Sequence, residues 1–348
     1  VTTCTGGGFM PFFHRKKLLV TLTAFAAALL VAVTAAAIWQ PFAVQTQQDF
    51  IRYVEFTPSY AALDRALQED IRAHEAGQSR SWIDTLSYLA ARYGGDFSKY
   101  RASDMDALFA KLDEGSSMEE LTADMKYYSY YHEAYSAVLD GLVGEYREET
   151  ETDGQKQWVE RYGLKGYFPL AKNFACEHYD DFGAQRTYGY TRRHLGHDIM
   201  AATGTPVIAV ESGVVEVMGW NQYGGWRIGI RSGNGRRYYY YAHLRQNRPF
   251  AEGLKEGQTV TAGQVIGYVG HTGYSTQENV NNIKIPHLHF GLELIFDESQ
   301  KESDNEIWID LYAFTQLLSR HKSETVRNAE TKEYTQKYKI EEILSGQK

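Results

Sequence analysis

The stretch from His287 to Leu294 reads HLHFGLEL and follows a proline. Its polar and apolar residues alternate over the first positions with a period of two, which is typical of a β-strand with one buried face. On such a strand Leu288 and Phe290 point into the core, whereas His287 and His289 project together from the opposite face. The stretch therefore predicts a strand that presents two imidazoles side by side.

Short runs of a similar kind lie between residue 167 and this strand. They are rich in β-branched or aromatic residues and are separated by glycines, as expected for strands joined by turns. The runs cover residues 206–210, 213–217, 226–230, 237–241 and 264–269. We assign residues 163–300 to one antiparallel β-sheet domain and expect the chain as a whole to be α+β.

The segment before this domain has helical periodicity up to about Tyr146. A first helix is predicted to begin at Thr57-Pro58, and a second is predicted to stop at Gly94-Gly95. Apolar residues recur at helical spacing in both, namely Leu63, Leu67 and Ile71 in the first and Trp82, Leu86, Leu89 and Tyr93 in the second. We assign residues 46–150 to a helical domain that serves as a stalk or spacer.

A third helix is predicted to start at Ser117. This serine, with Glu120 three residues later, has the pattern of a capping box. The predicted helix includes four tyrosines, which we interpret as core residues rather than as a ligand site: Tyr127, Tyr128, Tyr131 and Tyr135.

An apolar run covers residues 18–39 and is preceded by Arg15, Lys16 and Lys17. About 20 apolar residues span a bilayer as a helix, and the flanking positive charge predicts that residues 1–17 are cytoplasmic. The run is expected to be a single-pass membrane anchor, with the rest of the chain outside. A cleaved signal peptide is the alternative, with small residues at 35–37 for cleavage. Both readings export the protein.

The C-terminal part, residues 301–348, is expected to contain a short amphipathic helix around residues 309–318 and then a mobile charged tail. The whole chain carries a formal net charge of -8 and has a pI of about 5.8, which argues against a nucleic-acid-binding protein. Its two cysteines, Cys4 and Cys176, are too few for a cysteine-rich zinc site. A metal site would have to use histidines and carboxylates.

Six of the 11 histidines lie between His194 and His289. On a strand His194 and Asp198 share a face, because they are an even number of residues apart. Two strands supplying two imidazoles and a carboxylate can bind zinc and leave one position open. His243, and whichever of His287 and His289 is not a ligand, are the candidates for proton transfer. A closed structural zinc site is the alternative.

These motifs resemble the lysostaphin-type (LytM-like) zinc metalloendopeptidases that act on peptidoglycan. The resemblance covers roughly residues 166–296 and rests on an ordered set of short motifs rather than on any single one. The matching pieces are RHLGHD at 193–198, GTPV at 204–207, YAHL at 241–244, Gly257 with GQVIG at 263–267, TGYS at 272–275 and PHLHF at 286–290.

The resemblance implies that His194, Asp198 and His289 hold one zinc ion per chain. It implies that His287 is the general base or proton shuttle and that His243 helps to stabilise the oxyanion. The fold implied is a compact antiparallel sheet of the duplicated-hybrid-motif kind with a long groove. The reaction implied is amide hydrolysis in a peptide stem or cross-bridge of peptidoglycan.

Three departures from the family pattern affect substrate preference rather than the ligand set. Residues 276–285 form a longer link than usual before the H-x-H strand. Gly291 replaces a frequent acidic residue, and His197 replaces a small or apolar residue. On a strand His197 faces away from His194 and Asp198, so we interpret it as a supporting residue.

Two other functions fit parts of the sequence. A non-catalytic cell-wall-binding or assembly scaffold of the same fold would use the groove only for binding. A lipoyl or biotinyl carrier hairpin would use the glycine-bounded segments 253–257 and 263–267, because both folds need glycine at tight bends. The carrier reading is disfavoured because no lysine lies at a modifiable hairpin tip in the proper context and because export argues against a cofactor carrier.

Overall fold

The computed structural model describes residues 51, 53–188, 190–301 and 303–343. These residues belong to one compact unit. The expected membrane segment, residues 18–39, lies outside them. Within the described ranges no helix has both the length and the apolar character needed to cross a bilayer.

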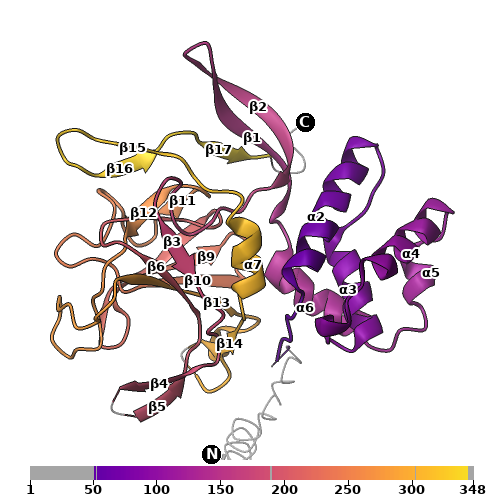
Figure 1. The fold of residues 1–348 in the computed structure, drawn as a ribbon, viewed down its shortest axis with the longest axis horizontal. Coiled ribbons are helices and arrows are strands. Elements are labelled where there is room, and N and C mark those ends of the chain that lie inside the picture. Colours follow the sequence, from indigo (N-terminus) through magenta and orange to yellow (C-terminus); the bar gives the residue numbers. More distant parts are fainter. Residues whose placement is uncertain (1–50, 52, 189, 302, 344–348) are drawn as a thin grey trace, which may run out of the picture. The chain divides into compact units, whose positions relative to one another are not determined.

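An antiparallel sheet forms the centre of this unit (Figure 1). Most of the predicted strands are present, and β13 coincides with the stretch quoted first. In order across the sheet its strands are β11 (Thr259–Val260), β8 (Gly213–Asn221), β9 (Gly225–Ser232), β10 (Arg237–Ala242), β13 (His287–Leu294), β6 (His197–Ala201) and β3 (Cys176–His178), with β14 (Ile307–Trp308) beside β13. The prediction of an antiparallel β domain is confirmed.

Alternation along β13 divides the sheet into two faces. Leu288, Phe290, Leu292 and Leu294 are buried in the hydrophobic core, and we call their side of the sheet the core face. His289 lies on the other side, which we call the site face. The two remaining predicted runs pair as β7 (Pro206–Ile208) and β12 (Val265–Tyr268), and a small hairpin of β4 (Gln185–Tyr188) and β5 (Tyr190–Arg193) precedes β6.

Five α-helices precede the sheet in the described chain: α2 (Tyr60–Glu75), α3 (Trp82–Tyr93), α4 (Ala102–Asp113), α5 (Met118–Thr122) and α6 (Tyr128–Leu139). Helix α2 starts later than predicted, because Ser59 rather than Thr57 caps it and accepts a hydrogen bond from the Ala62 amide. Helix α3 ends at Gly94 in the left-handed conformation, as the glycine pair predicts.

The predicted third helix is two helices. The capping box of Ser117 and Glu120 is present, but α5 ends at Thr122 and α6 begins only at Tyr128. The tyrosines consequently differ in environment. Tyr131 and Tyr135 are buried, whereas Tyr127 is 52% exposed, so only part of the stripe belongs to the core.

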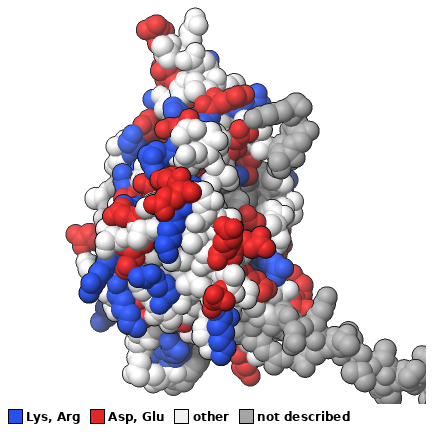
Figure 2. Space-filling model, turned by 90° about the vertical axis from the view of Figure 1, so that its right-hand side faces the viewer, with Lys and Arg blue, Asp and Glu red and all other residues white. Residues whose placement is uncertain are grey.

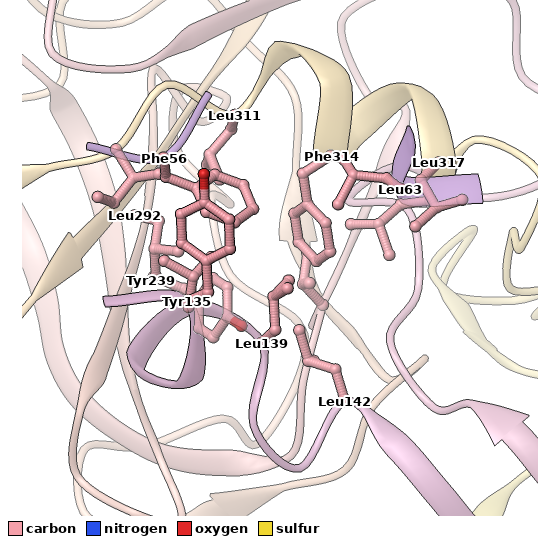
Figure 3. Close-up of a cluster of buried hydrophobic side chains, with 14 of the residues drawn as sticks. Phe56, Leu63, Tyr135, Leu139, Leu142, Tyr239, Leu292, Leu311, Phe314 and Leu317 are labelled. Atoms are coloured by element: carbon pink, nitrogen blue, oxygen red, sulfur yellow. The ribbon is translucent and has the colours of Figure 1, made fainter. Parts of the chain in front are cut away.

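The helices pack on the core face of the sheet. Figure 3 shows Leu63, Tyr135 and Leu139 from the helices meeting Tyr239 and Leu292 from the sheet in one cluster. Helix α7 (Tyr312–Leu318), which was predicted around residues 309–318, lies between them and adds Phe314 and Leu317 (Figures 1 and 3). The helical segment thus shares its core with the sheet and leaves the site face uncovered.

A long hairpin joins the helices to the sheet, where sequence periodicity predicted helix up to Tyr146. Its strands are β1 (Val143–Thr152) and β2 (Gln155–Leu164). Asp153 and Gly154 connect them, both with positive φ, which is the conformation that a two-residue Asp-Gly hairpin turn requires. The Asp-Gly pair was the sequence signal for this hairpin.

The charged tail was expected to be mobile, and this expectation is wrong for the described residues up to 343. The tail forms β15 (Thr325–Arg327), β16 (Tyr334–Gln336) and β17 (Ile340–Glu342). Strand β17 pairs with β1, and Ile340 is only 2% exposed. One buried isoleucine in an otherwise polar tail therefore helps to fix its position.

The surface on the helical side mixes both signs of charge (Figure 2). Ion pairs account for part of this mixture, among them Arg72 with Glu69 and Arg65 with Asp106. Acidic and basic side chains are interspersed on this face rather than gathered into separate fields.

Candidate metal centre and groove

Three side chains converge on the site face. His289 lies on β13 directly opposite Asp198 on β6, and His194 comes from the turn before β6. His194 Nε2 lies 2.9 Å from His289 Nδ1 and 3.0 Å from Asp198 Oδ1, and His289 Nδ1 lies 3.1 Å from the same oxygen. His194 and Asp198 are buried and His289 is partly buried. We call these three residues the triad.

His194 reaches the triad by a different route from the one predicted. It does not share a strand with Asp198, because β6 begins only at His197. The chain turns through Leu195 and Gly196, and Gly196 packs against the His289 ring. A Cβ at this position would lie 2.5 Å from His289 Cε1, which is too close for any side chain. Glycine in RHLGHD is therefore needed for the triad to close.

Asp181 holds His194 from behind and was not recognised in the sequence. His194 Nδ1 lies 3.1 Å from the Asp181 carbonyl oxygen and 3.2 Å from its carboxylate. Since both partners only accept, Nδ1 carries the proton and Nε2 presents its lone pair to the triad. The Asp181 carboxylate also accepts from the Asp198 amide. Asp181 follows Asp180 in a loop, and no spacing pattern marks it as a partner of His194.

The charges around the triad favour a cation. Burial alone would lower the pKa of His194, but hydrogen bonds to Asp181 and Asp198 outweigh it and raise that pKa to about 9. Burial would raise the pKa of Asp198, yet its hydrogen bonds with His194 and His289 hold the pKa well below its ordinary value. Without a metal, the two carboxylates stabilise a proton on His194.

The donor set fits zinc. Two imidazole nitrogens and one carboxylate oxygen are ligands that Zn²⁺ prefers, and three protein ligands leave a fourth position open. Bonds of about 2.0–2.2 Å in a tetrahedron separate ligand atoms by roughly 3.4 Å, only slightly more than the sides of this triangle. The outer hydrogen bond of His194 is also of the kind that orients metal-bound histidines.

Two more imidazoles border the triad. The His243 ring lies 4.9 Å from the His287 ring and 5.8 Å from the His289 ring, centre to centre. His243 Nδ1 lies 2.9 Å from the Thr272 carbonyl, and His287 Nδ1 lies 2.8 Å from the Ile285 carbonyl. Each Nδ1 must donate to its carbonyl, so each neutral ring keeps an accepting Nε2.

Backbone hydrogen bonds hold His243 in an uncommon conformation. His243 is a non-glycine residue with positive φ, an uncommon conformation that usually needs support from its surroundings. Its amide donates to Gly224 O and its carbonyl accepts from the Gly270 amide. Burial and the neighbouring His287 and His289 lower the pKa of His243 well below its ordinary value, so its ring is neutral at physiological pH.

His197 lies behind the triad, as predicted. It is 1% exposed and its Nε2 lies 3.0 Å from His178 Nδ1. Its own Nδ1 lies 3.8 Å from the Asp181 carboxylate, so it contacts the residue that orients His194. His271 is held by the Ile283 carbonyl in the loop between β12 and β13.

A cavity of about 520 Å³ opens beside His289 on the site face. Tyr240 and Trp308 form part of its wall, and the Tyr240 ring contacts the His289 and Trp308 rings edge to face. Gly291 lies under Trp308, where a Cβ would come within 2.7 Å of the indole. The departure at Gly291 is thus explained by the packing of Trp308.

The long link at residues 276–285 is folded back on the protein. Asn279 Oδ1 accepts hydrogen bonds from Trp226 Nε1 and from the Asn247 amide, at 2.9 and 2.8 Å. The Asn279 carbonyl accepts from Gln246 as well. The insertion is therefore anchored at its middle, next to the loop that carries His243.

Known proteins share this part of the chain. Residues 192–303 match Peptidase family M23. An L-Ala–D-Glu endopeptidase of Bacillus subtilis is 46% identical over 125 residues, which cover 36% of this chain and 37% of that protein. Lysostaphin of Staphylococcus staphylolyticus is 41% identical over 139 residues, 38% of this chain and 22% of lysostaphin. The chain thus spans well under half the length of these two relatives.

A solved structure extends the likeness in fold. The crystal structure of a lytM protein from Ruminococcus gnavus matches with a TM-score of 0.52 and 23% identity, over 79% of this chain and 92% of that one. The match therefore reaches well beyond residues 192–303, although identity at this level concerns the fold alone. Together, the family match and the lysostaphin-type relatives show that this chain carries a peptidase family M23 domain.

Proposed function

We propose that this chain is a zinc-dependent endopeptidase that hydrolyses peptide bonds of bacterial peptidoglycan outside the cell membrane. One observation carries the proposal: His194, Asp198 and His289 converge within about 3 Å of one another beside two imidazoles with accepting nitrogens. A structural zinc site would have four protein ligands and no need for such neighbours.

His194, Asp198 and His289 would hold the metal through Nε2, a carboxylate oxygen and Nδ1. When bound, zinc supplies Lewis-acid chemistry, which polarises an amide carbonyl and makes water a nucleophile near neutral pH. Asp181 keeps the His194 proton on Nδ1 and so keeps Nε2 free for the metal. Arg186 Nη2 lies 3.2 Å from Asp198 Oδ2 and fixes the orientation of that carboxylate.

His287 is the proposed general base. Its Nε2 lies 3.7 Å from Asp198 Oδ1, at the edge of the triad, and can accept a proton from the attacking water and return it to the leaving amine. His243 is proposed to stabilise the oxyanion. Since its Nδ1–H is committed to Thr272, it can donate from Nε2 only after it accepts a proton. The proton that His287 takes from the attacking water would supply it, passing to His243 while the oxyanion exists and returning through His287 to the leaving amine.

The relatives support peptidoglycan as the substrate. The Bacillus subtilis protein is named for cleavage of an L-Ala–D-Glu bond, and lysostaphin is another relative. The proposed substrate is accordingly a peptide stem or cross-bridge. Export follows from the apolar run at residues 18–39, either as a retained single-pass anchor or as a cleaved signal peptide.

Digestion of purified peptidoglycan by the purified full-length chain tests the proposal. We expect new free amines and peptide fragments by mass spectrometry, loss of both after chelation, and recovery on adding zinc. Cleavage that persisted in a chelator-treated, demonstrably zinc-free sample, or no cleavage by zinc-loaded protein, would overturn it.

A wall-binding scaffold is separated from an enzyme by His287→Ala. This variant keeps all three triad residues, so it should retain zinc while kcat falls by about 10²- to 10⁴-fold. If the biological role survives in cells carrying this variant, the groove binds without cutting. His271→Ala, in a loop outside the triad, is the matched control.

A further inference from the structure

Three arginines line the cavity beside the triad, and two of them, Arg192 and Arg227, are partly buried whereas Arg193 is exposed. Arg192 and Arg227 both line it, together with His289 and Tyr240. Arg192 lies near the end of β5 and Arg227 lies on β9, so the two come from separate strands. Their positive charges lie beside the proposed metal ligand His289 and could bind an anionic group of the substrate.

Arg227 lies in line with the triad across the sheet. His289 pairs with Asp198 on one side and with Ala242 on the other. Ile228 pairs with Tyr241, so Arg227 is one step further, opposite Ala242. Neighbouring strands are about 4.8 Å apart, which puts the Arg227 backbone roughly 10 Å from that of His289. Ala242 itself is buried, and Arg227, Tyr240 and His289 line the cavity around it.

Arg192 is fixed from the other side. Its guanidinium lies 5.2 Å from the ring centres of both Tyr223 and Tyr274, and one terminal nitrogen donates to the Tyr274 hydroxyl at 2.5 Å. This aromatic contact orders a flexible side chain before any ligand arrives. Arginine held in this way loses little conformational entropy on binding.

Both guanidinium groups retain unused donors. The buried Nε atoms of Arg192 and Arg227 have no hydrogen-bond partner among the described residues. A buried unpaired donor is costly, and an acceptor on a ligand is one way to satisfy it.

The other charged residues of the cavity are differently placed. Lys301 forms an ion pair with Glu216, and Glu306 accepts a hydrogen bond from Trp308 Nε1. Glu293 lies further along β13, beside Tyr238. These contacts leave the Arg192 and Arg227 end of the cavity, next to His289, as the end that favours an anion.

We infer that Arg192 and Arg227 form a subsite for a free carboxylate on the substrate peptide, within about one residue of the bond that is cut. The inference rests on the proposed function and names the substrate class for it: a peptide with a carboxylate next to the scissile amide rather than an uncharged glycine bridge. A planar carboxylate can accept paired hydrogen bonds from guanidinium groups.

Three synthetic peptides test the subsite with the zinc-loaded full-length chain. They share one amide to be cut and differ in the neighbouring residue, which carries a free main-chain carboxylate through a γ-linkage, a carboxylate on its side chain, or the corresponding carboxamide. We expect one carboxylate peptide to exceed the carboxamide in kcat/KM by about 10- to 100-fold. The better of the two identifies which carboxylate is bound.

Substitution of the arginines locates the effect. In Arg227→Gln the carboxylate preference should disappear, and in Arg227→Lys it should be partly retained, because the charge remains without the planar fork. Arg231→Gln is the matched control: this arginine shares the strand and face of Arg227 but pairs with Glu216 outside the cavity. It should keep the full preference.

The outcomes separate the subsite from the reaction. If all three peptides are cut equally, or if Arg227→Gln slows all of them equally, the subsite is wrong while the hydrolase stands. If no peptide is cut, peptidoglycan digestion decides the proposed function, and calorimetric binding of the same peptides decides the subsite. Tighter binding of a carboxylate peptide that Arg227→Gln abolishes would support it, and equal binding of all three would refute it.

Discussion

Two buried polar clusters lie on opposite faces of the same sheet, and they satisfy their charges in different ways. On the core face Arg237 is 1% exposed and donates to both oxygens of Glu211, at 2.8 and 2.7 Å. Tyr239 donates to the same carboxylate. The remaining guanidinium bonds go to the carbonyls of Ala137 and Asp140 at the end of α6. We call Arg237, Glu211 and Tyr239 the closed cluster.

The triad on the site face has the opposite balance. His194 Nε2, His289 Nδ1 and an Asp198 oxygen lie close enough together to bind one cation, and the triad itself supplies donors only when one of its imidazoles is protonated at these nitrogens. In the closed cluster the donors of Arg237 and Tyr239 are paired with protein acceptors, namely Glu211 and two backbone carbonyls. The triad instead gathers acceptors that a cation would satisfy. Such imbalance, rather than burial or charge alone, distinguishes a binding centre from a structural ion pair.

The largest expected effect comes from removing the triad carboxylate. Asp198→Ala should lower bound zinc from about one ion per chain to near zero and abolish peptidoglycan cleavage, since two imidazoles alone do not make a three-ligand site. Metal analysis of the purified chain measures the first effect. Added zinc at about 100 times its Kd should stabilise the wild-type chain by about 2.7 kcal/mol but not the variant. Full zinc occupancy in Asp198→Ala would mean that the triad is not the metal centre.

Breaking the closed cluster should instead cost stability. Arg237→Met leaves the Glu211 carboxylate buried without its cation, and this should lower the free energy of unfolding by about 3–5 kcal/mol. Denaturant titration measures the loss, and zinc content of the folded fraction should stay at wild-type level. The double variant Arg237→Met with Glu211→Met should lose less, because it leaves no unpaired charge. Loss of zinc from folded Arg237→Met would contradict the separation of the two clusters.

A smaller effect is expected behind the triad. Asp181→Asn keeps the size of the side chain but removes the charge that orients His194, and outer partners of this kind are worth about 10- to 100-fold in metal affinity. Competition with a chromogenic chelator measures the change. Asp180→Asn, one residue away and exposed, is the matched control and should leave zinc affinity unchanged. Equal affinities for the two variants would show that the backbone carbonyl of Asp181 alone orients His194.

The sequence was most informative where periodicity and motif coincide. His289 was placed correctly because HLHFGLEL alternates, and its bounds as a strand match the structure. His194 and Asp198 were brought together for the wrong geometric reason, since a turn and not a shared strand positions His194. The RHLGHD motif still predicted that His194 and Asp198 lie together. Gly196 makes the turn between them possible, and the spacing of the two residues does not show this.

Other features lacked a local signal or had one that was overlooked. Strands β15, β16 and β17 have three residues each, too few for a period to be recognised. Asp181 contacts His194, and Arg192 and Arg227 line the cavity. Each is separated in sequence from the residues it meets there, so only the tertiary structure brings them together. The β1–β2 hairpin is different, because Asp153-Gly154 marks its turn in the sequence.

The smallest expected effect comes from removing one hydrogen bond to Glu211 in the closed cluster. Tyr239→Phe removes one of the donors to Glu211 and leaves both Arg237 bonds in place, so the free energy of unfolding should fall by only about 1 kcal/mol. The midpoint of urea unfolding measures it, and a double-mutant cycle with Glu211→Gln should show that the two changes are not additive, since they remove the same contact. Zinc affinity should be unchanged, because Tyr239 lies on the core face. A tenfold fall in zinc affinity would mean that the sheet couples its two faces, and the closed cluster would then support the metal centre as well as the fold.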